Sequence, residues 1–105
     1  MAYEIVLAPG AVEALKALSA ARRAELQAAL EVHLRHEPTK LSKSRIKRLR
    51  GLSRPQYRLR VGELRVFYDV IESEVQVLAV ISKAQAQAWL EQEGVADEGG
   101  GPSQG

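Results

Sequence analysis

The sequence contains no cysteine, few aromatic residues and no long apolar run. Of its 105 residues none is Cys and 5% are aromatic. Disulfide scaffolds, cysteine-ligated zinc and thiol nucleophiles are therefore excluded, and the reducing cytoplasm is the expected compartment. The longest nearly uncharged stretch, residues 75–81, is far shorter than the roughly 20 apolar residues of a membrane-spanning helix. Neither a membrane segment nor a signal peptide is predicted.

Negative charge is almost missing from the middle of the chain. Residues 40–65 hold ten Lys and Arg but one acidic residue, whereas the whole chain has a formal net charge of +2. Ten cations in so short a segment create a local field that attracts a polyanion. The alternative interpretation is a solvated basic face that only confers solubility.

The hydrophobic periodicity predicts one small α+β domain over residues 1–94, followed by a disordered, Gly-rich tail over 95–105. The expected elements are an N-terminal strand (3–7), a helical hairpin (12–18 and 19–36, with Ser19 as a cap), a three-stranded antiparallel meander (57–61, 64–71 and 74–81) and a C-terminal helix (83–93). The basic segment 38–55 is predicted to be a connection with one helical turn near 46–49.

The alternation in residues 57–71 predicts which side chains share a face of the meander. With the turn at residues 62 and 63, Arg60 lies opposite Arg65. Like charges opposite each other in a sheet are unfavourable unless an anion binds there, and guanidinium groups grip phosphate bidentately. The face predicted to point to solvent and to bind a phosphodiester carries Arg58, Arg60, Arg65 and Phe67. Internal neutralisation by Asp69, Glu63 or tail carboxylates is the alternative.

Three stretches resemble one protein family. These are YRLRVGELRVFYDVI at residues 57–71, the opening YEIVLAPGAVEALKAL, and KRLRG before the meander. Together they resemble the RelE/ParE toxins of type II toxin-antitoxin modules, over about residues 2–90. For the RelE branch the resemblance implies cleavage of mRNA in the ribosomal A site and inhibition by a cognate antitoxin. ParE relatives, which inhibit DNA gyrase, share the scaffold, so gyrase is the alternative target.

The RelE branch implies attack of a ribose 2′-OH on the adjacent phosphate, which needs no metal or other cofactor. The resemblance assigns the catalytic positions to Arg58, Arg60, Arg65 and Lys83. Arg replaces the Lys of the best-known members on the first meander strand, and Trp89 occupies the family's Tyr position. Neither Arg nor Trp readily transfers a proton. Charge stabilisation is thus predicted to be retained, while proton transfer depends on Lys83 or on ribosomal RNA.

The other cations of the basic segment are predicted to contact the RNA backbone without reading bases. They are Lys40, Lys43, Arg45, Lys47, Arg48 and Arg50. Trp89 is predicted to fill core beneath the sheet, with stacking on an RNA base as the alternative.

His33 and His36 lack a third ligand and are predicted to be surface residues, so no metal is expected. The expected partners are mRNA on the ribosome and an acidic antitoxin. A catalytically silent module that binds nucleic acid or the antitoxin is the remaining alternative.

Overall fold

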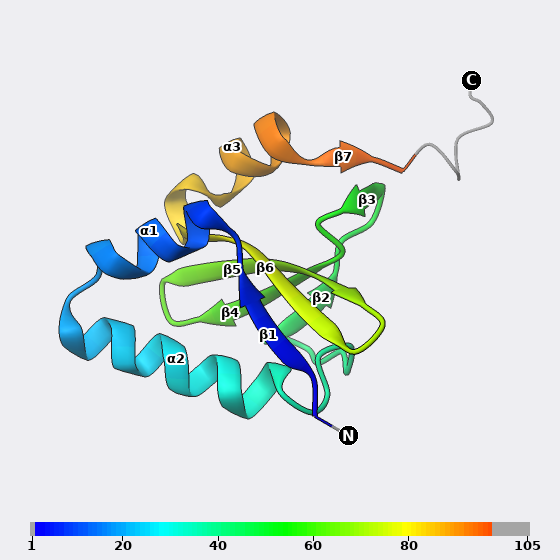
Figure 1. Cartoon of the computed structure of the whole chain (residues 1–105). Coiled ribbons are helices and arrows are strands. Elements are labelled where there is room, and N and C mark those ends of the chain that lie inside the picture. The colour runs from blue at the N-terminus through cyan, green and yellow to red at the C-terminus, as the bar shows by residue number, and fades with distance from the viewer. Residues whose placement is uncertain (1, 98–105) are drawn as a thin grey trace.

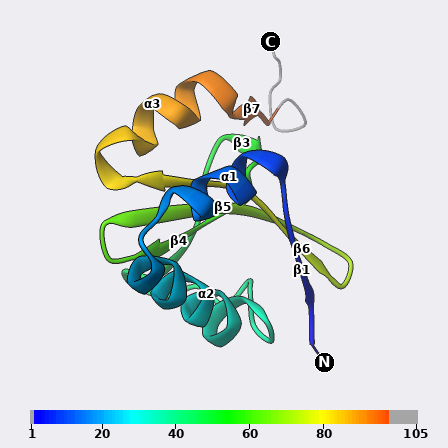
Figure 2. The ribbon, with the colours of Figure 1, turned by 60° about the vertical axis from the view of Figure 1, so that its left-hand side comes forward.

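A computed structural model describes residues 2–97 of the chain. It contains a five-stranded sheet with helices α1 and α2 on one side and α3 on the other (Figures 1 and 2). The elements are β1 (Glu4–Leu7), α1 (Pro9–Ala17), α2 (Ala20–Leu34), β2 (Ile46–Arg48), β3 (Leu52–Arg54), β4 (Tyr57–Val61), β5 (Leu64–Ile71), β6 (Glu74–Ser82), α3 (Lys83–Glu93) and β7 (Val95–Ala96). Within the described residues, no helix is both long and apolar enough to span a membrane.

The strand order in the main sheet is β1-β6-β5-β4-β2. Strands β4, β5 and β6 form the antiparallel meander, β1 pairs in parallel with β6, and β2 pairs antiparallel with β4. Strands β3 and β7 make a separate two-stranded ribbon. The predicted α+β fold class and its order of elements are confirmed.

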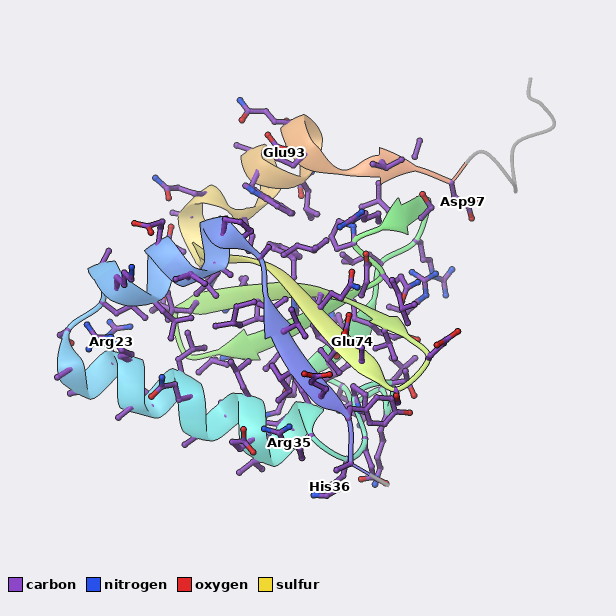
Figure 3. All side chains as sticks on the ribbon, viewed as in Figure 1. Arg23, Arg35, His36, Glu74, Glu93 and Asp97 are labelled. Carbon is purple, nitrogen blue, oxygen red and sulfur yellow. The ribbon has the colours of Figure 1, made fainter. Side chains whose placement is uncertain are left out.

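The helical hairpin forms where the sequence changes from strand-breaking to helix-favouring residues. Pro9 occupies the first turn of α1, where its missing N–H costs nothing. Ser19 caps α2 as predicted, because its side chain accepts a hydrogen bond from the Arg22 amide at 3.2 Å. Arg23 then donates to the carbonyl oxygens of Leu15 and Leu18, so it ties the end of α1 to the start of α2 (Figure 3).

The main core lies between this hairpin and one face of the sheet, here called the core face. Its buried residues are Ala11, Leu15, Leu26, Leu30, Leu34, Ile46, Leu59, Val66, Tyr68, Val75, Val77 and Val80. The Tyr68 hydroxyl is also buried, and it donates to the Pro38 carbonyl oxygen at 2.6 Å. The opposite face of the sheet is here called the arginine face.

The prediction of a helical turn near residues 46–49 is wrong. Residues 46–48 form β2, with Ile46 opposite Leu59 and Lys47 opposite Arg58. The buried Ile46 joins the core, while Lys47 is exposed, which is the alternation of an edge strand. Pairing with the long meander overrides local propensity here, because it satisfies backbone groups that a single helical turn leaves open.

The first residues of the predicted tail also differ from the expectation. Val95 and Ala96 form β7, which pairs with β3, and the Asp97 amide donates to the Gly51 carbonyl oxygen at 3.0 Å. They are ordered because β3, nearby in space although distant in sequence, offers free backbone hydrogen-bonding groups. Residues 98–105 of the predicted tail lie outside the described residues.

Candidate active site

Three arginines share one side of the β4–β5 hairpin. Arg60 pairs with Arg65 and Arg58 pairs with Phe67, which is the predicted register. Because facing residues in an antiparallel pair point to the same side, Arg58, Arg60 and Arg65 all belong to the arginine face. We call these three residues the arginine cluster.

The members of the arginine cluster differ in exposure. Arg60 is exposed, Arg58 is half-buried, and Arg65 is only 9% exposed. The Nη1 atom of Arg65 donates to the carbonyl oxygens of Gly62 and Leu64, each at 2.9 Å. The predicted solvent exposure of this face is therefore wrong for Arg65, because its guanidinium folds back onto the hairpin turn.

The Arg58 guanidinium has one nitrogen that donates a hydrogen bond and another that is buried without a partner. Its Nη2 donates to the Ser44 carbonyl oxygen at 3.1 Å, whereas its Nε is buried without a hydrogen-bond partner among the described residues. Burial lowers the pKa of Arg58, and the nearby charges of Arg65 and Arg60 lower it further. The cation remains protonated, so the cluster creates an uncompensated positive potential that an anion would relieve.

No carboxylate of the described residues forms an ion pair with the cluster. The buried Asp69 bonds elsewhere, with Oδ2 3.2 Å from Arg54 Nε and Oδ1 accepting from the Gln56 amide. Glu63 is exposed in the hairpin turn without an ion pair to a described residue. Asp69 and Glu63 therefore do not neutralise the arginine cluster, contrary to the alternative interpretation. The tail carboxylate of Glu98 lies outside the described residues.

Lys83 begins α3 next to the hairpin turn. Its backbone amide donates to the Glu63 carbonyl oxygen at 2.7 Å, and its side chain is exposed. The turn that joins Arg60 to Arg65 therefore also positions the start of α3. Lys83 is the residue of the predicted catalytic set whose side chain is able to exchange a proton.

The sequence predicted that Trp89 fills core beneath the sheet, and the structure places it outside the main core. It is half-buried on the arginine face, where its ring stacks on Phe67 with centroids 5.0 Å apart and planes inclined by 11°. Phe67 is 1% exposed in consequence, so its predicted exposure is also wrong. Phe67 thus covers one face of the Trp89 ring. An RNA base could stack on Trp89 only from the surface hollow that the ring borders, which is also lined by Ile81, Gln85, Ala88 and Gln92.

No tyrosine of the described residues lies on the arginine face, and Tyr3 packs against the main core. Tyr57 and Tyr68 stack on each other on the core face, with centroids 5.5 Å apart. Burial raises the pKa of Tyr68, and the neighbouring Tyr57 adds to this effect. Neither phenol therefore replaces the family Tyr in proton transfer at the arginine cluster.

The six cations predicted to bind RNA are not gathered into one site. Lys40 lies 3.7 Å from a carboxylate oxygen of Glu37. Arg48 Nη1 donates to the carbonyl oxygens of Leu49 and Gln56, and its guanidinium lies over the Tyr57 ring. Four of the six side chains make no hydrogen bond or ion pair with a described residue: Lys43, Arg45, Lys47 and Arg50. Lys47 lies opposite Arg58 in the β2–β4 pair, and Arg45 lies beside Arg60.

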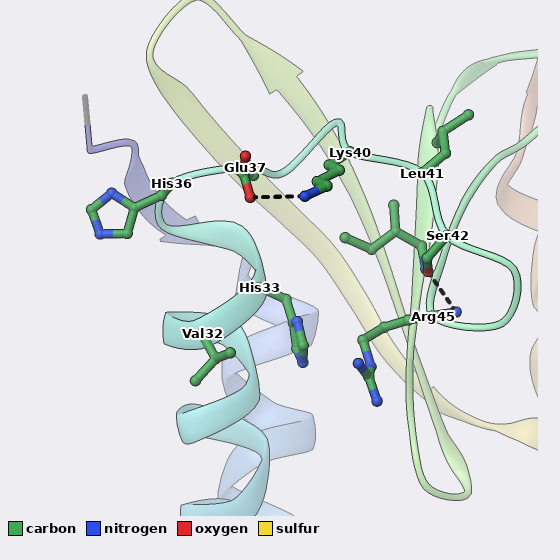
Figure 4. Close-up of a pocket in the computed structure, with 9 residues that line it drawn as sticks. Val32, His33, His36, Glu37, Lys40, Leu41, Ser42 and Arg45 are labelled. Atoms are coloured by element: carbon green, nitrogen blue, oxygen red, sulfur yellow. Dashed lines mark hydrogen bonds and ion pairs between the residues drawn. The ribbon is translucent and has the colours of Figure 1, made fainter.

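The two histidines border a cleft of about 290 Å³ between the end of α2 and the segment that leads to β2 (Figure 4). His33 is half-buried and His36 is exposed. Burial lowers the pKa of His33, and the charge of Arg45 on the opposite wall lowers it further. Among the described residues, no group of three or more His, Cys, Asp or Glu side chains is arranged to hold a metal ion.

Sequence reasoning did not include Ser44 or Gly62 among the site residues. Both line a polar hollow beside the cluster together with Arg45 and Arg60. The backbone carbonyl oxygen of Ser44 accepts a hydrogen bond from Arg58, and that of Gly62 accepts one from Arg65. Gly62 has a left-handed backbone conformation, with φ of 58°. The turn at Gly62 was predicted from the hairpin pattern, and the register of β4 and β5 confirms it. The pairing that brings Ser44 beside this turn was not predicted.

Comparison with solved structures places this arrangement in a known fold. A chain of the archaeal RelE-RelB complex from Pyrococcus horikoshii OT3 superposes with a TM-score of 0.58 and 21% identity, covering 81% of this chain and 99% of that chain. A mutant of the E. coli toxin RelE in the free state superposes with a TM-score of 0.53 and 22% identity, covering 87% and 94%. No family model matches the sequence, and no curated protein does. The chain therefore has the fold of the RelE toxins over most of its length, as its sequence resemblance implied.

Proposed function

We propose that this chain is the toxin of a type II toxin-antitoxin module and inhibits translation by cleaving mRNA on the ribosome, in the cytoplasm. The observation that carries the proposal is the arginine cluster on a fold shared with RelE toxins. Three guanidinium groups lie together without a carboxylate partner, and the Nε of Arg58 is buried and unsatisfied. Such a site favours a dianionic transition state over a neutral ligand.

The reaction we propose is internal transesterification at one phosphodiester. The 2′ oxygen attacks phosphorus, the O2′–P bond forms and the P–O5′ bond breaks, which gives a 2′,3′-cyclic phosphate and a free 5′-OH. Arg58 and Arg60 stabilise the charge on the phosphorane oxygens, and Arg65 adds positive potential from its fixed place at the turn. Lys83 donates a proton to the leaving O5′, and the proton of the 2′-OH passes to water or to ribosomal RNA.

We propose an acidic antitoxin as the protein partner. One structural neighbour was solved as a RelE-RelB complex. Residues 40–65 of this chain carry ten cations and one carboxylate, so an acidic segment is electrostatically complementary. A neighbouring reading frame that encodes a small acidic protein and restores growth on co-expression would support this partner.

Inhibition of DNA gyrase without RNA cleavage is the second candidate function. The observation that favours it is the absence of any tyrosine from the arginine face within residues 2–97. Under this alternative the arginine cluster serves only in binding.

Induction of the chain in bacteria, with mapping of mRNA 5′ ends, tests the proposal. We expect cuts at fixed positions within codons, lost in Arg58→Ala and retained in Arg22→Ala, which removes an exposed cation from α2. Growth arrest with intact mRNA and a DNA-damage response would instead establish the gyrase alternative. Induction without any effect on growth would leave the catalytically silent binding module.

A further inference from the structure

A polar hollow lies beside the arginine cluster, at the turn end of the β4–β5 hairpin. It has a volume of about 320 Å³ and is lined by Ser44, Arg45, Arg60 and Gly62. Since a water takes up about 30 Å³ of the liquid, the hollow has room for a hydrated phosphate group.

The sheet itself brings two arginines to this hollow. The Arg60 amide donates to the Arg45 carbonyl oxygen at 2.8 Å, one residue before β2 begins. Arg65 lies opposite Arg60 on the other side. Arg45, Arg60 and Arg65 therefore occupy one row across three neighbouring segments of the chain, and neighbouring like charges are unfavourable in such a row.

Nothing in the described part of the chain offsets the charges at the hollow. The side chains of Arg45 and Arg60 make no hydrogen bond or ion pair with a described residue, and the exposed Glu63 pairs with neither. On its other side Arg45 faces His33, whose pKa is lowered by burial and further by the charge of Arg45. Arg45 and Arg60 both line this concave site without a competing side-chain contact, and guanidinium groups are suited to binding an oxyanion.

The hollow is continuous with the arginine cluster. Arg60 belongs to both, and Arg58 Nη2 donates to the Ser44 carbonyl oxygen at 3.1 Å. The Gly62 carbonyl oxygen likewise accepts from Arg65 Nη1. If one phosphate of a nucleic-acid strand binds at the arginine cluster, the hollow therefore lies beside the next phosphate of that strand.

We infer that the hollow binds the phosphodiester adjacent to the one held by Arg58 and Arg60, so that Arg60 lies between the two phosphates. The inference rests on the proposed function and deepens it: the ligand is single-stranded RNA, gripped at two successive phosphates. The contact involves backbone charge and no base edge, so it sets the position of the strand without setting the sequence that is bound.

The first test measures how RNA affinity depends on salt. The probe is a short fluorescent oligoribonucleotide with 2′-O-methyl riboses, which the chain is unable to cleave by 2′-OH attack, and the readout is fluorescence anisotropy. Losing one phosphate contact reduces the slope of log affinity against log salt by about 0.7 for a single strand. We expect this reduction in Arg45→Gln and not in the matched control Arg22→Gln. Arg45→Lys should keep the slope but bind more weakly, because Lys lacks the bidentate geometry.

The second test locates the contacts along the strand. Each phosphate of the same probe is replaced in turn by a neutral methylphosphonate. We expect replacement at two adjacent positions to weaken binding to the wild-type chain, and Arg45→Gln to become insensitive at one of them. A wild-type slope and profile in Arg45→Gln overturn the inference.

Failure of the inference is distinguishable from failure of the proposed function. If Arg58→Ala abolishes mRNA cleavage while Arg45→Gln binds like wild type, the hollow is no phosphate site and the nuclease proposal stands. If no methylphosphonate weakens binding to the wild-type chain, or the chain binds no RNA, the inference is overturned, and the mapping of mRNA 5′ ends still decides the proposed function.

Discussion

Arg60 and Arg65 lie directly opposite each other across β4 and β5, yet their side chains occupy different environments. The Arg60 side chain is exposed and makes no hydrogen bond to a described residue, whereas the Arg65 side chain donates to two carbonyl oxygens of the hairpin turn and the residue is 9% exposed. One arginine of the pair is thus available to a ligand, and the other is also part of the structure of the turn.

Arg65→Ala and Arg60→Ala should therefore separate stability from activity. Hydrogen bonds from charged donors contribute roughly 1.5–3 kcal/mol, so we expect Arg65→Ala to lower the free energy of unfolding by about 1–2 kcal/mol. Arg60→Ala should change it by less than about 0.5 kcal/mol, as for other exposed sites. Both should reduce toxicity. Urea unfolding and growth assays check this, and equal losses of stability would contradict it.

Arg58→Met should make the domain more stable while it weakens RNA binding. The Nε of Arg58 is buried without a partner beside two other cations, so its charge opposes folding. Replacing buried charge by an apolar side chain of similar length stabilises some proteins by 1–4 kcal/mol, and we expect about 1 kcal/mol for this half-buried residue. Chemical denaturation and anisotropy measure the two effects, with Arg22→Met as the control. A destabilised variant would mean that Arg58 has a compensating partner.

Trp89→Ala should loosen α3 from the sheet. The variant loses the stack of Trp89 on Phe67 and exposes the Phe67 side chain, which is 1% exposed in the wild-type chain. We expect a loss of about 2 kcal/mol and faster hydrogen exchange in α3, with β4 and β5 amides still protected. Ala88→Ser, at an exposed position on the same helix, is the matched control. Unchanged exchange in α3 would show that other contacts hold the helix.

Stability should fall as the pH drops from about 7 toward 5 because of His33. Its folded pKa is lowered by burial and by Arg45, so folding favours the neutral ring. The contribution is fully present above the unfolded pKa of about 6.5 and is lost as the pH falls through the folded pKa. NMR titration should show a higher His33 pKa in Arg45→Gln. An unchanged titration in this variant would mean that burial acts alone.

The predicted strands and helices of the meander and the C-terminal segment match the structure closely, whereas the basic connection does not. Helix 83–93 was bounded by local signals, a strand end before it and Gly94 after it. Residues 46–54 contain Ser, Gly and many cations, which favour a loop, but they form two strands because β4 and β7 are available to pair with them. Pairing partners of this kind have no signature within the segment itself.

The sequence by itself determined the register of β4 and β5 and the common side of Arg58, Arg60 and Arg65, because side chains alternate along a strand and a two-residue turn fixes the pairing. Only the tertiary structure decided which of these arginines faces solvent, and that Trp89 covers Phe67. Arg65 is buried because its guanidinium bonds the carbonyl oxygens of the hairpin turn, whereas the stack of Trp89 on Phe67 depends on the path of α3 across the sheet. That path is set by packing between residues distant in sequence, so no local pattern encodes it.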